Sequence, residues 1–359
     1  MKRKLKSILV TGGAGFIGSN FIHYVFKETT FGGKIVNADK LTYAGNLENL
    51  QEIDGKFGGE RYFFERADIS DFDKIKKIFE KYDIDMVVNF AAESHVDRSI
   101  FGPKEFMQTN IMGTFNLLEV ARECWRRKES GEILFHHIST DEVYGSVEEG
   151  EYFLESTAYQ PNSPYSASKA SSDHLVRAYY KTYGLPVTIS NCSNNYGPYQ
   201  FPEKLIPLMI LNILEEKDLP VYGDGKNIRD WLYVKDHCEA IWIIVQRGRK
   251  GETYNIGGSN EWENIEVVQK ICDILAEEIE KDSQELKKLI TFVKDRPGHD
   301  FRYAINSNKI KKELGWRPKE SFDSGLRKTI KWYLNNQTWV DNIKTGTYKK
   351  WLKHNYYDR

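Results

Sequence analysis

The apolar residues of the N-terminal half form short continuous runs that alternate with stretches of helical spacing. Residues 7–10, 34–38 and 86–90 are three such runs, and residues 72–82 carry apolar side chains three and four positions apart. Short buried runs predict strands, and the intervening spacing predicts amphipathic helices. Strands that alternate with helices in this way favour a parallel sheet covered by helices on both faces.

The alternation continues to about residue 190 and becomes less regular afterwards. Further elements are expected as strands at 61–65, 132–138, 188–190, 219–222, 229–236 and 252–257, and as helices at 103–127, 163–183, 205–214, 238–245 and 263–280. The predicted fold class is therefore α/β, with a doubly wound parallel-sheet domain of the Rossmann type and a smaller, partly interleaved C-terminal α/β domain. No internal repeat or low-complexity linker separates the two parts, so the second should pack against the first.

The loop after the first predicted strand is rich in glycine. Gly12, Gly15 and Gly18 stand three residues apart, directly between the strand and an apolar helix. Glycines allow a tight turn and let backbone N–H groups approach a pyrophosphate, which the N-terminus of the helix stabilises. Strand, glycine turn and helix in this order predict a dinucleotide site.

A carboxylate follows the second predicted strand. Asp39 lies 21 residues beyond Gly18, where an acidic side chain can accept hydrogen bonds from an adenosine ribose. A 2′-phosphate would be repelled there, so NAD is favoured over NADP, although Lys40 next to it weakens the preference slightly. The plainer alternative is a loop aspartate without a ligand. We predict an NAD-binding domain over residues 1–190, to which 228–257 return, and a substrate domain mainly over 191–359.

Charge and cysteine usage narrow the class of protein. The chain of 359 residues has 51 basic and 52 acidic side chains, so no global field favours nucleic acid or an anionic membrane. No apolar run approaches the roughly 20 residues that cross a bilayer, and the apolar run after the basic start is too short for a signal peptide. The four cysteines are far apart and contain no C-x-x-C, which argues against a metal site and against disulfides. A cytoplasmic location fits best.

Two groups of residues have side chains suited to proton transfer. Thr140, Asp141 and Glu142 follow a predicted strand, and Tyr165 and Lys169 lie four residues apart on one face of a predicted helix. An ammonium near a tyrosine favours the phenolate, so Lys169 is expected to lower the pKa of Tyr165. Taken separately, the carboxylates could cap a helix and the pair could be an exposed one. Together beside a dinucleotide, they indicate hydride and proton transfer.

Three motifs together resemble the extended short-chain dehydrogenase/reductase superfamily that acts on nucleotide sugars. They are the glycine loop, Tyr165-x-x-x-Lys169, and the sequence Arg-Asp-x-x-Tyr-Val-x-Asp at 229–236. Within that superfamily, residues 91–97, 139–145 and 194–200 resemble the 4,6-dehydratases. The resemblance runs from about Ser7 to about Trp332, and the triplet at 140–142 is its most specific part.

The resemblance implies a reaction that starts and ends with hydride transfer. Tyr165 would deprotonate the 4-hydroxyl of the sugar as NAD takes the hydride, and Thr140 would hydrogen-bond that hydroxyl. Glu142 would then remove the C5 proton while a protonated Asp141 protonates the departing C6 oxygen, and hydride would return to C6. The expected substrate is dTDP-glucose and the product a 4-keto-6-deoxy sugar for deoxysugar synthesis; UDP-glucose is the alternative substrate.

The resemblance also implies the contact residues of both ligands. For the cofactor they are Gly12, Gly15, Phe16, Ile17, Gly18, Asp39, Lys40, Leu41, Thr42, Asp68, Ile69, Ala91, Ala92, Ser94, Thr109, Tyr165, Lys169 and Asn195. For the nucleotide sugar they are Ser94, His95, Thr140, Asn194, Lys204, Leu205, Pro220, Val221, Tyr222, Arg229, Asn264, Arg296 and His299. The two arginines suit phosphate oxygens best, while a surface role is equally open for Lys204 and His299.

Several other activities share parts of this pattern. A nucleotide-sugar 4-epimerase needs the cofactor loop and the Tyr/Lys pair but not an acid and a base aimed at C6 and C5. A nucleotide-sugar decarboxylase or a GDP-mannose dehydratase tends to resemble this sequence with Ser in place of Asp141. A non-catalytic NAD sensor would be expected to lack Tyr165 or Lys169. A homodimer is expected, with the helices that begin near Pro103 and Tyr165 packed into a four-helix bundle.

Overall fold

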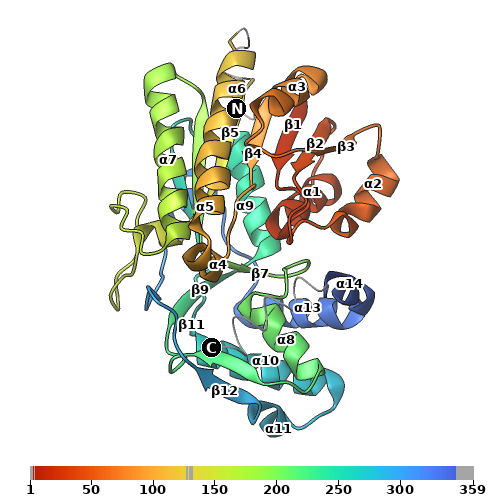
Figure 1. Ribbon diagram of the computed structural model, residues 1–359, viewed down its shortest axis with the longest axis vertical. Coiled ribbons are helices and arrows are strands. Elements are labelled where there is room, and N and C mark those ends of the chain that lie inside the picture. Colours follow the sequence, from red (N-terminus) through yellow and green to blue (C-terminus); the bar gives the residue numbers. More distant parts are fainter. Residues whose placement is uncertain (1–2, 4, 127, 129–131, 345–359) are drawn as a thin grey trace.

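A seven-stranded sheet forms the larger part of the molecule (Figure 1). The computed structural model describes residues 3, 5–126, 128 and 132–344. Neighbouring strands are parallel throughout, in the order β10-β6-β5-β4-β1-β2-β3. Their bounds are β1 Ser7–Thr11, β2 Lys34–Asp39, β3 Tyr62–Arg66, β4 Met86–Asn89, β5 Leu134–Thr140, β6 Val187–Cys192 and β10 Thr253–Ile256. The predicted doubly wound α/β class is confirmed.

Helices cover both faces of this sheet. On one face lie α3 (Phe72–Tyr82), α6 (Thr114–Cys124) and α7 (Pro164–Tyr183), and they bury Ile75, Leu117 and Val176 against the strands. On the other face lie α1 (Phe16–Glu28), α2 (Gln51–Phe57) and α9 (Val234–Arg247), whose Phe21 and Ile241 share a second core. The continuous apolar runs of the strands are explained by burial on both faces.

The helix predicted over residues 103–127 consists of three consecutive segments. α5 (Pro103–Phe106) leads into a π-helical stretch, η2 (Met107–Gly113), which continues as α6. A Cβ atom on Gly113 would lie 2.5 Å from Ile69 Cδ1, so only glycine allows this close approach. The wider π turns place Thr109 at the cavity described below. The expected helix end at residue 127 lies outside the described residues.

The smaller part of the molecule lies below the large sheet in Figure 1. It has a three-stranded sheet, β11-β9-β7, and a two-stranded sheet, β12-β8. Their bounds are β7 Asn194–Tyr196, β8 Leu219–Tyr222, β9 Ile228–Tyr233, β11 Glu261–Glu263 and β12 Ile290–Val293. The surrounding helices are α8 Leu205–Leu214, α10 Asn264–Ile279, α11 Ser283–Lys287, α13 Phe322–Asn335 and α14 Gln337–Ile343. α12 Asn308–Leu314 packs instead against α9 and β10 at the edge of the large sheet. The short elements α4 Val96–Phe101, η1 Leu47–Leu50 and η3 Asp141–Tyr144 complete the described chain.

The chain crosses between the two parts more than once. β9 belongs to the small sheet, but α9 starts directly after it at Val234 and packs against α1, and β10 then joins the edge of the large sheet beside β6. The predicted strand over 229–236 therefore ends at Tyr233, because Val234 is fully buried in the core under the large sheet. Across the described residues, none of the helices combines the length and apolar character that a bilayer crossing requires.

Candidate active site

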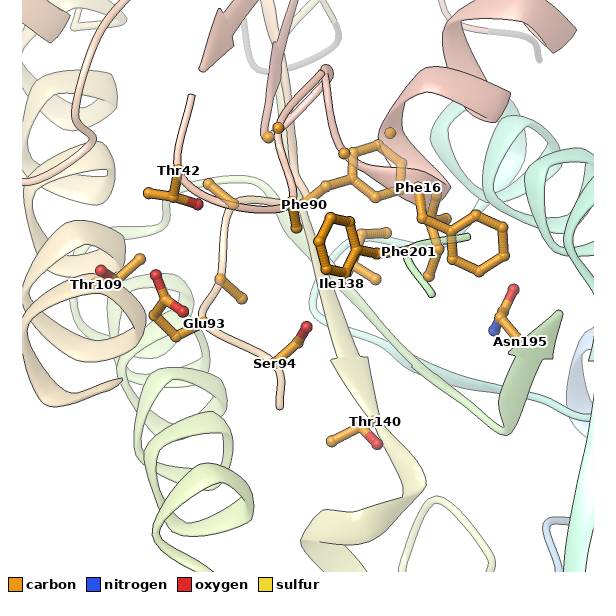
Figure 2. A pocket seen from close by; sticks show the side chains of 18 of the residues that line it. Phe16, Thr42, Phe90, Glu93, Ser94, Thr109, Ile138, Thr140, Asn195 and Phe201 are labelled. Atoms are coloured by element: carbon orange, nitrogen blue, oxygen red, sulfur yellow. The ribbon is translucent and has the colours of Figure 1, made fainter. Parts of the chain in front are cut away.

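A cavity of about 310 Å³ lies at the carboxyl ends of the parallel strands. It is lined by the loops that follow β1, β2, β4 and β5, by α7, and by residues 192–204. Figure 2 shows Thr140 at the end of β5, with Ser94 on one side of it and Asn195 on the other. Ligands of doubly wound sheets bind at this edge, so the cavity lies where the sequence predicted it.

The glycine loop leaves room for a pyrophosphate at the start of α1. Gly12 has a φ of +67°, and a Cβ atom on Gly18 would lie 2.3 Å from the Gly12 carbonyl oxygen. Gly15 caps the helix without any side-chain hydrogen bond, and the first turn of α1 has no acidic residue. The N–H groups of this turn therefore face the cavity without a competing side chain, which fits a dinucleotide phosphate.

Asp39 stands at the end of β2 with its carboxylate held in place. One oxygen accepts the Ala14 N–H at 2.9 Å and the other accepts the Leu41 N–H at 2.8 Å. The neighbouring Lys40 extends to Asp68, with its ammonium 2.7 Å from that carboxylate. The charge of Lys40 is thus paired. Burial raises the pKa of Asp39, the two backbone N–H groups oppose that increase, and the side chain lines the cavity where an adenosine ribose would lie. These residues fit NAD better than NADP.

Asp39→Asn should lower the affinity for NAD by about tenfold, because charged hydrogen bonds to the ribose are lost. It should also narrow the difference in affinity between NAD and NADP, because the repulsion of a 2′-phosphate is lost. Fluorescence titrations with both cofactors measure the two dissociation constants. The amide nitrogen of Asn cannot accept an N–H, so the variant loses either the Ala14 or the Leu41 hydrogen bond. A thermal melt checks that it still folds. An unchanged ratio of the two constants would contradict this role of Asp39.

Asp141 and Glu142 lie in the 3-10 turn η3, directly after β5. Thr140 caps this turn by accepting the Glu142 N–H at 3.2 Å, and its hydroxyl donates to Asp141 Oδ1 at 3.3 Å. The side chain of Asp141 is buried, with only 1% of the residue exposed. The turn thus presents two adjacent carboxyl groups to one cavity.

The two carboxyl groups have different electrostatic surroundings. Burial raises the pKa of Asp141 well above its usual range, and Glu142 and Asp230 raise it further. Burial also raises the pKa of Glu142, but the cations Arg296, Lys204 and Arg229 oppose this effect. Asp141 therefore holds a proton under conditions in which Glu142 can be ionised, which is the division required of an acid and a base.

Tyr165 and Lys169 are placed by the well-capped start of α7. Pro164 occupies the first turn, and Ser163 forms a capping box with Ser166. Lys169 Nζ donates to the Ile138 carbonyl oxygen on β5 at 2.7 Å. Both side chains line the cavity beside Thr140.

The pKa of Tyr165 differs from the sequence prediction. Burial raises it well above its usual value, Glu142 adds to that increase, and a hydrogen bond with Thr140 opposes it. The expected lowering by Lys169 was wrong for this structure, because the Lys169 ammonium is directed at the Ile138 carbonyl and Tyr165 is buried beside a carboxylate. Tyr165 on its own is therefore a neutral phenol.

The cavity brings together most of the residues predicted for the two ligands. Those lining it are Gly12, Gly15, Phe16, Ile17, Gly18, Asp39, Lys40, Thr42, Asp68, Ile69, Ala91, Ala92, Ser94, Thr109, Thr140, Asp141, Glu142, Tyr165, Lys169, Asn194, Asn195 and Lys204. Those that do not line it are Leu41, His95, Leu205, Pro220, Val221, Tyr222, Arg229, Asn264, Arg296 and His299. Of this second set, Leu41, which follows β2, was predicted to contact the cofactor. The other residues were predicted to contact the nucleotide sugar.

Two residues of this second set, Arg229 and Arg296, form a basic cluster next to Glu142. Tyr222 donates to Asp97 Oδ2 at 3.1 Å, and Arg296 Nη1 lies 3.7 Å from Asp97 Oδ1. Arg229 donates to the Asp300 carbonyl at 2.8 Å and stacks 4.2 Å from the ring of Tyr303. Both guanidinium groups act on the pKa of Glu142, so the cluster lies near the chemistry although it is outside the cavity wall.

The remaining predicted contacts are less directly placed. Val221 is 2% exposed and packs in the core of the smaller part, so its side chain is not available to a base and only its backbone could make a contact. Asn264 starts α10 and donates its N–H to the Asn227 carbonyl at 3.0 Å. His95 is buried at the start of α4.

Sequence reasoning did not identify several residues of the cavity wall. Those with polar, acidic or aromatic side chains include Glu93, Cys192, Ser193, Gln200, Phe201 and Glu203. The position of Cys192 and Ser193 at the end of β6 corresponds to that of Thr140 at the end of β5, so the rule used for β5 could have found them. Glu203 precedes Lys204 and pairs with Arg98 at 3.1 Å, a contact that no local pattern predicts.

A Rossmann sheet with a glycine loop, an acidic residue after β2 and a Tyr/Lys pair on α7 defines an NAD-dependent enzyme of the short-chain dehydrogenase/reductase class. The family model of GDP-mannose 4,6 dehydratase matches residues 9–329. The dTDP-glucose 4,6-dehydratase of Salmonella typhimurium is 56% identical, over 98% of this chain and 99% of that protein. The chain belongs to the dTDP-glucose 4,6-dehydratase family, as its sequence motifs predicted.

Solved structures agree with this assignment. The Bacillus anthracis dTDP-glucose 4,6-dehydratase in complex with NAD has a TM-score of 0.84 at 48% identity and covers 94% of this chain and 100% of that one. The Streptomyces venezuelae enzyme DesIV, solved with NAD and TYD bound, has a TM-score of 0.85 at 44% identity, with coverage of 94% and 100%. Both of these structures contain NAD, which is the cofactor that the glycine loop and Asp39 of this chain fit.

Proposed function

We propose that this protein converts dTDP-glucose into dTDP-4-keto-6-deoxyglucose by an NAD-dependent 4,6-dehydration. The observation that carries the proposal is the pair Asp141 and Glu142, whose surroundings separate their proton affinities within one cavity. A 4-epimerase has no use for such a pair, and a Ser in place of Asp141 would be expected for the decarboxylases and for a GDP-mannose dehydratase.

The first step removes hydrogen from C4 of the sugar. NAD, when bound, accepts hydride from C4, later returns it to C6, and brings a positive nicotinamide ring into the site. Tyr165 takes the proton of the 4-hydroxyl, which Thr140 holds by a hydrogen bond. Because Tyr165 is neutral in this structure, it must first release its own proton to solvent once the ligands are bound.

The second step removes water across C5 and C6. The 4-keto group makes the C5–H acidic, and Glu142 takes that proton. Asp141 gives its proton to the C6 oxygen, which leaves as water. When hydride returns to C6, Glu142 gives its proton back to C5 and becomes a carboxylate again. Asp141 is then left without its proton and Tyr165 holds the one it took, so a net transfer of one proton from Tyr165 to Asp141 resets the site.

The basic cluster is proposed to hold the nucleotide diphosphate. Arg229 and Arg296 offer guanidinium groups suited to phosphate oxygens, and Lys204 extends to the Ser94 carbonyl at 3.2 Å on the way to the cavity. Asn194 is proposed to contact the sugar phosphate, and the strand with Pro220 and Tyr222 to contact the base. We also propose that residues 1–190, to which 228–257 return, form the NAD-binding domain, and that residues 191–359 mainly form the domain that binds the nucleotide sugar.

A homodimer in the cytoplasm is proposed for the assembled enzyme. Exposed apolar side chains support the dimer: Phe101 on α4, Met112 on η2 and Tyr183 on α7 are 59, 45 and 54% exposed. Met112 and Tyr183 belong to the two helices that were predicted to form a four-helix bundle with a second copy, and Phe101 ends the short helix just before them. The four cysteines are free, which suits a reducing compartment.

Incubation with dTDP-glucose and NAD should yield a 4-keto-6-deoxy product, which is detected by its absorbance in alkali. UDP-glucose, assayed in parallel, reports how strongly the base is read. UDP-galactose serves as the epimerase substrate. Turnover of UDP-galactose with none of dTDP-glucose would rule out the dehydratase function.

A further inference from the structure

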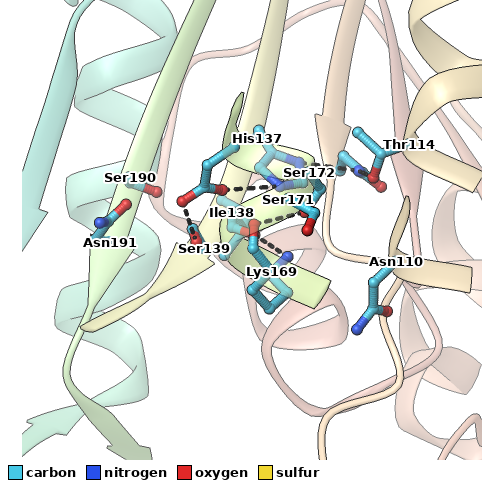
Figure 3. A network of polar contacts seen from close by, with 12 residues as sticks. Asn110, Thr114, His137, Ile138, Ser139, Lys169, Ser171, Ser172, Ser190 and Asn191 are labelled. Atoms are coloured by element: carbon cyan, nitrogen blue, oxygen red, sulfur yellow. Dashed lines mark hydrogen bonds and ion pairs between the residues drawn. The ribbon is translucent and has the colours of Figure 1, made fainter. Parts of the chain in front are cut away.

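A buried polar network connects α7 to the strands β5 and β4 behind the cavity (Figure 3). At its centre is Asp173, fully buried and one helical turn beyond Lys169. Its Oδ2 atom accepts the Ser139 hydroxyl at 2.8 Å and the Tyr159 hydroxyl at 2.9 Å, and its Oδ1 atom lies 3.3 Å from His137 Nε2. A carboxyl group with this many donors around it is stabilised as the anion.

The histidine in this network is neutral. The Asn89 amide nitrogen lies 3.1 Å from His137 Nδ1, so that ring nitrogen accepts and the hydrogen is on Nε2, 3.3 Å from Asp173 Oδ1 but not aligned for a hydrogen bond with it. Burial lowers the pKa of His137 to about 4, and Lys169 lowers it as well. The contact between His137 and Asp173 therefore leaves the negative charge of Asp173 uncompensated.

Burial lowers the pKa of Lys169, and the charge of Asp173 opposes this effect. Lys169 is 4% exposed, and its ammonium donates to the Ile138 carbonyl, which carries no net charge (Figure 3). The groups that favour its charged form are Asp173 on the same helix and Cys192 on β6. Burial keeps the pKa of the Cys192 thiol far above neutrality, and Tyr165 is likewise uncharged. Among the described residues that act on Lys169, Asp173 is thus the one that is ionised at neutral pH.

We propose that Asp173 is a positioning residue for the reaction, acting as the buried counter-ion that keeps Lys169 charged while the Ile138 carbonyl orients its ammonium. The separation of four residues places the two side chains on one face of α7. The proposal rests on the proposed function, because Lys169 takes part in the oxidation step. The competing explanation is a purely structural one, in which Asp173 only ties α7 to Ser139 and Tyr159.

The charge of Lys169 can be followed directly in the holoenzyme. Lysine labelled with carbon-13 at Cε gives NMR signals that titrate with pH, and the signal missing from Lys169→Gln identifies Lys169. In Asp173→Asn the Lys169 midpoint should move to lower pH. In the same variant, kcat/KM for dTDP-glucose should fall about tenfold more at alkaline than at neutral pH. An unmoved midpoint would overturn the proposal.

Tyr159→Phe is the matched control. It removes one neutral donor from Asp173 but keeps the charge, and Tyr159 does not line the cavity. In Tyr159→Phe, the pH midpoint of the Lys169 titration should stay near that of the unmodified protein. If Asp173 had only a structural role, Tyr159→Phe and Asp173→Asn would shift this midpoint alike. Failure of the proposed function would be seen separately, as an unmodified enzyme that titrates normally but does not turn over dTDP-glucose.

A double variant covers the case in which Asp173→Asn does not fold. Asp173→Asn combined with Lys169→Gln removes both buried charges, and breaking only one member of a buried pair is the costly change. The double variant should therefore fold and melt at a higher temperature than Asp173→Asn. Additive losses of melting temperature in the two single variants would overturn the pairing.

Discussion

Asp141→Asn should lower the steady-state turnover of dTDP-glucose by about 10²–10⁴-fold and leave reduced cofactor on the enzyme. The amide keeps the shape of the side chain but has no proton of suitable acidity for the C6 oxygen. Oxidation at C4 does not require Asp141, so NADH forms and then waits for water to leave. Single-turnover absorbance follows the first step and product formation follows the second. An unchanged steady-state rate would refute the assignment.

Glu142→Gln is the companion variant that separates the acid from the base. Both variants should block water loss, but only Glu142 is expected to remove the C5 proton. In heavy water, Asp141→Asn should therefore still introduce deuterium at C5 of the sugar recovered from the enzyme, and Glu142→Gln should not. Equal exchange in the two variants would mean that the roles are not divided in this way.

The raised pKa of Asp141 also fixes the direction of the pH dependence. Its folded-state pKa lies above the unfolded value, so the folded protein binds the extra proton, and stability falls as pH rises between those two values. Turnover declines over the upper part of that range as the acid is lost. Asp141→Asn removes the titration, so its free energy of unfolding should change less with pH across that range.

The sheet could be predicted because its signal is local. The runs of apolar residues that form β1, β2 and β4 are buried on both faces, and no distant residue is needed to recognise them. The π-helical stretch η2 could not be predicted in this way, since its apolar spacing resembles that of an α-helix. Its wider turns accompany a distant contact, the approach of Gly113 to Ile69.

Residues of the candidate site could be predicted from the sequence where they stand at the carboxyl end of a strand. Thr140 ends β5, and Asp141 and Glu142 follow it, so the strand-end rule placed them at the ligand edge before any contact was known. The pKa of Tyr165 was not predictable, because it depends on burial and on Glu142 in another element. Similarly, Arg229 and Arg296 reach Glu142 from segments about 90 and 150 residues further along the chain, which no spacing reveals.

Tyr165→Phe should lower turnover by about 10²–10⁴-fold with no reduced cofactor at any stage, in contrast to Asp141→Asn. The variant loses only the hydroxyl that takes the C4 proton, so NAD should still bind while its absorbance as NADH never rises. Tyr62→Phe is the matched control, since Tyr62 is a buried tyrosine on β3 whose hydroxyl accepts a hydrogen bond from Asn37 at 3.0 Å, away from the cavity. The control should keep its activity; NADH formation by Tyr165→Phe at the normal rate would show that another group is the base.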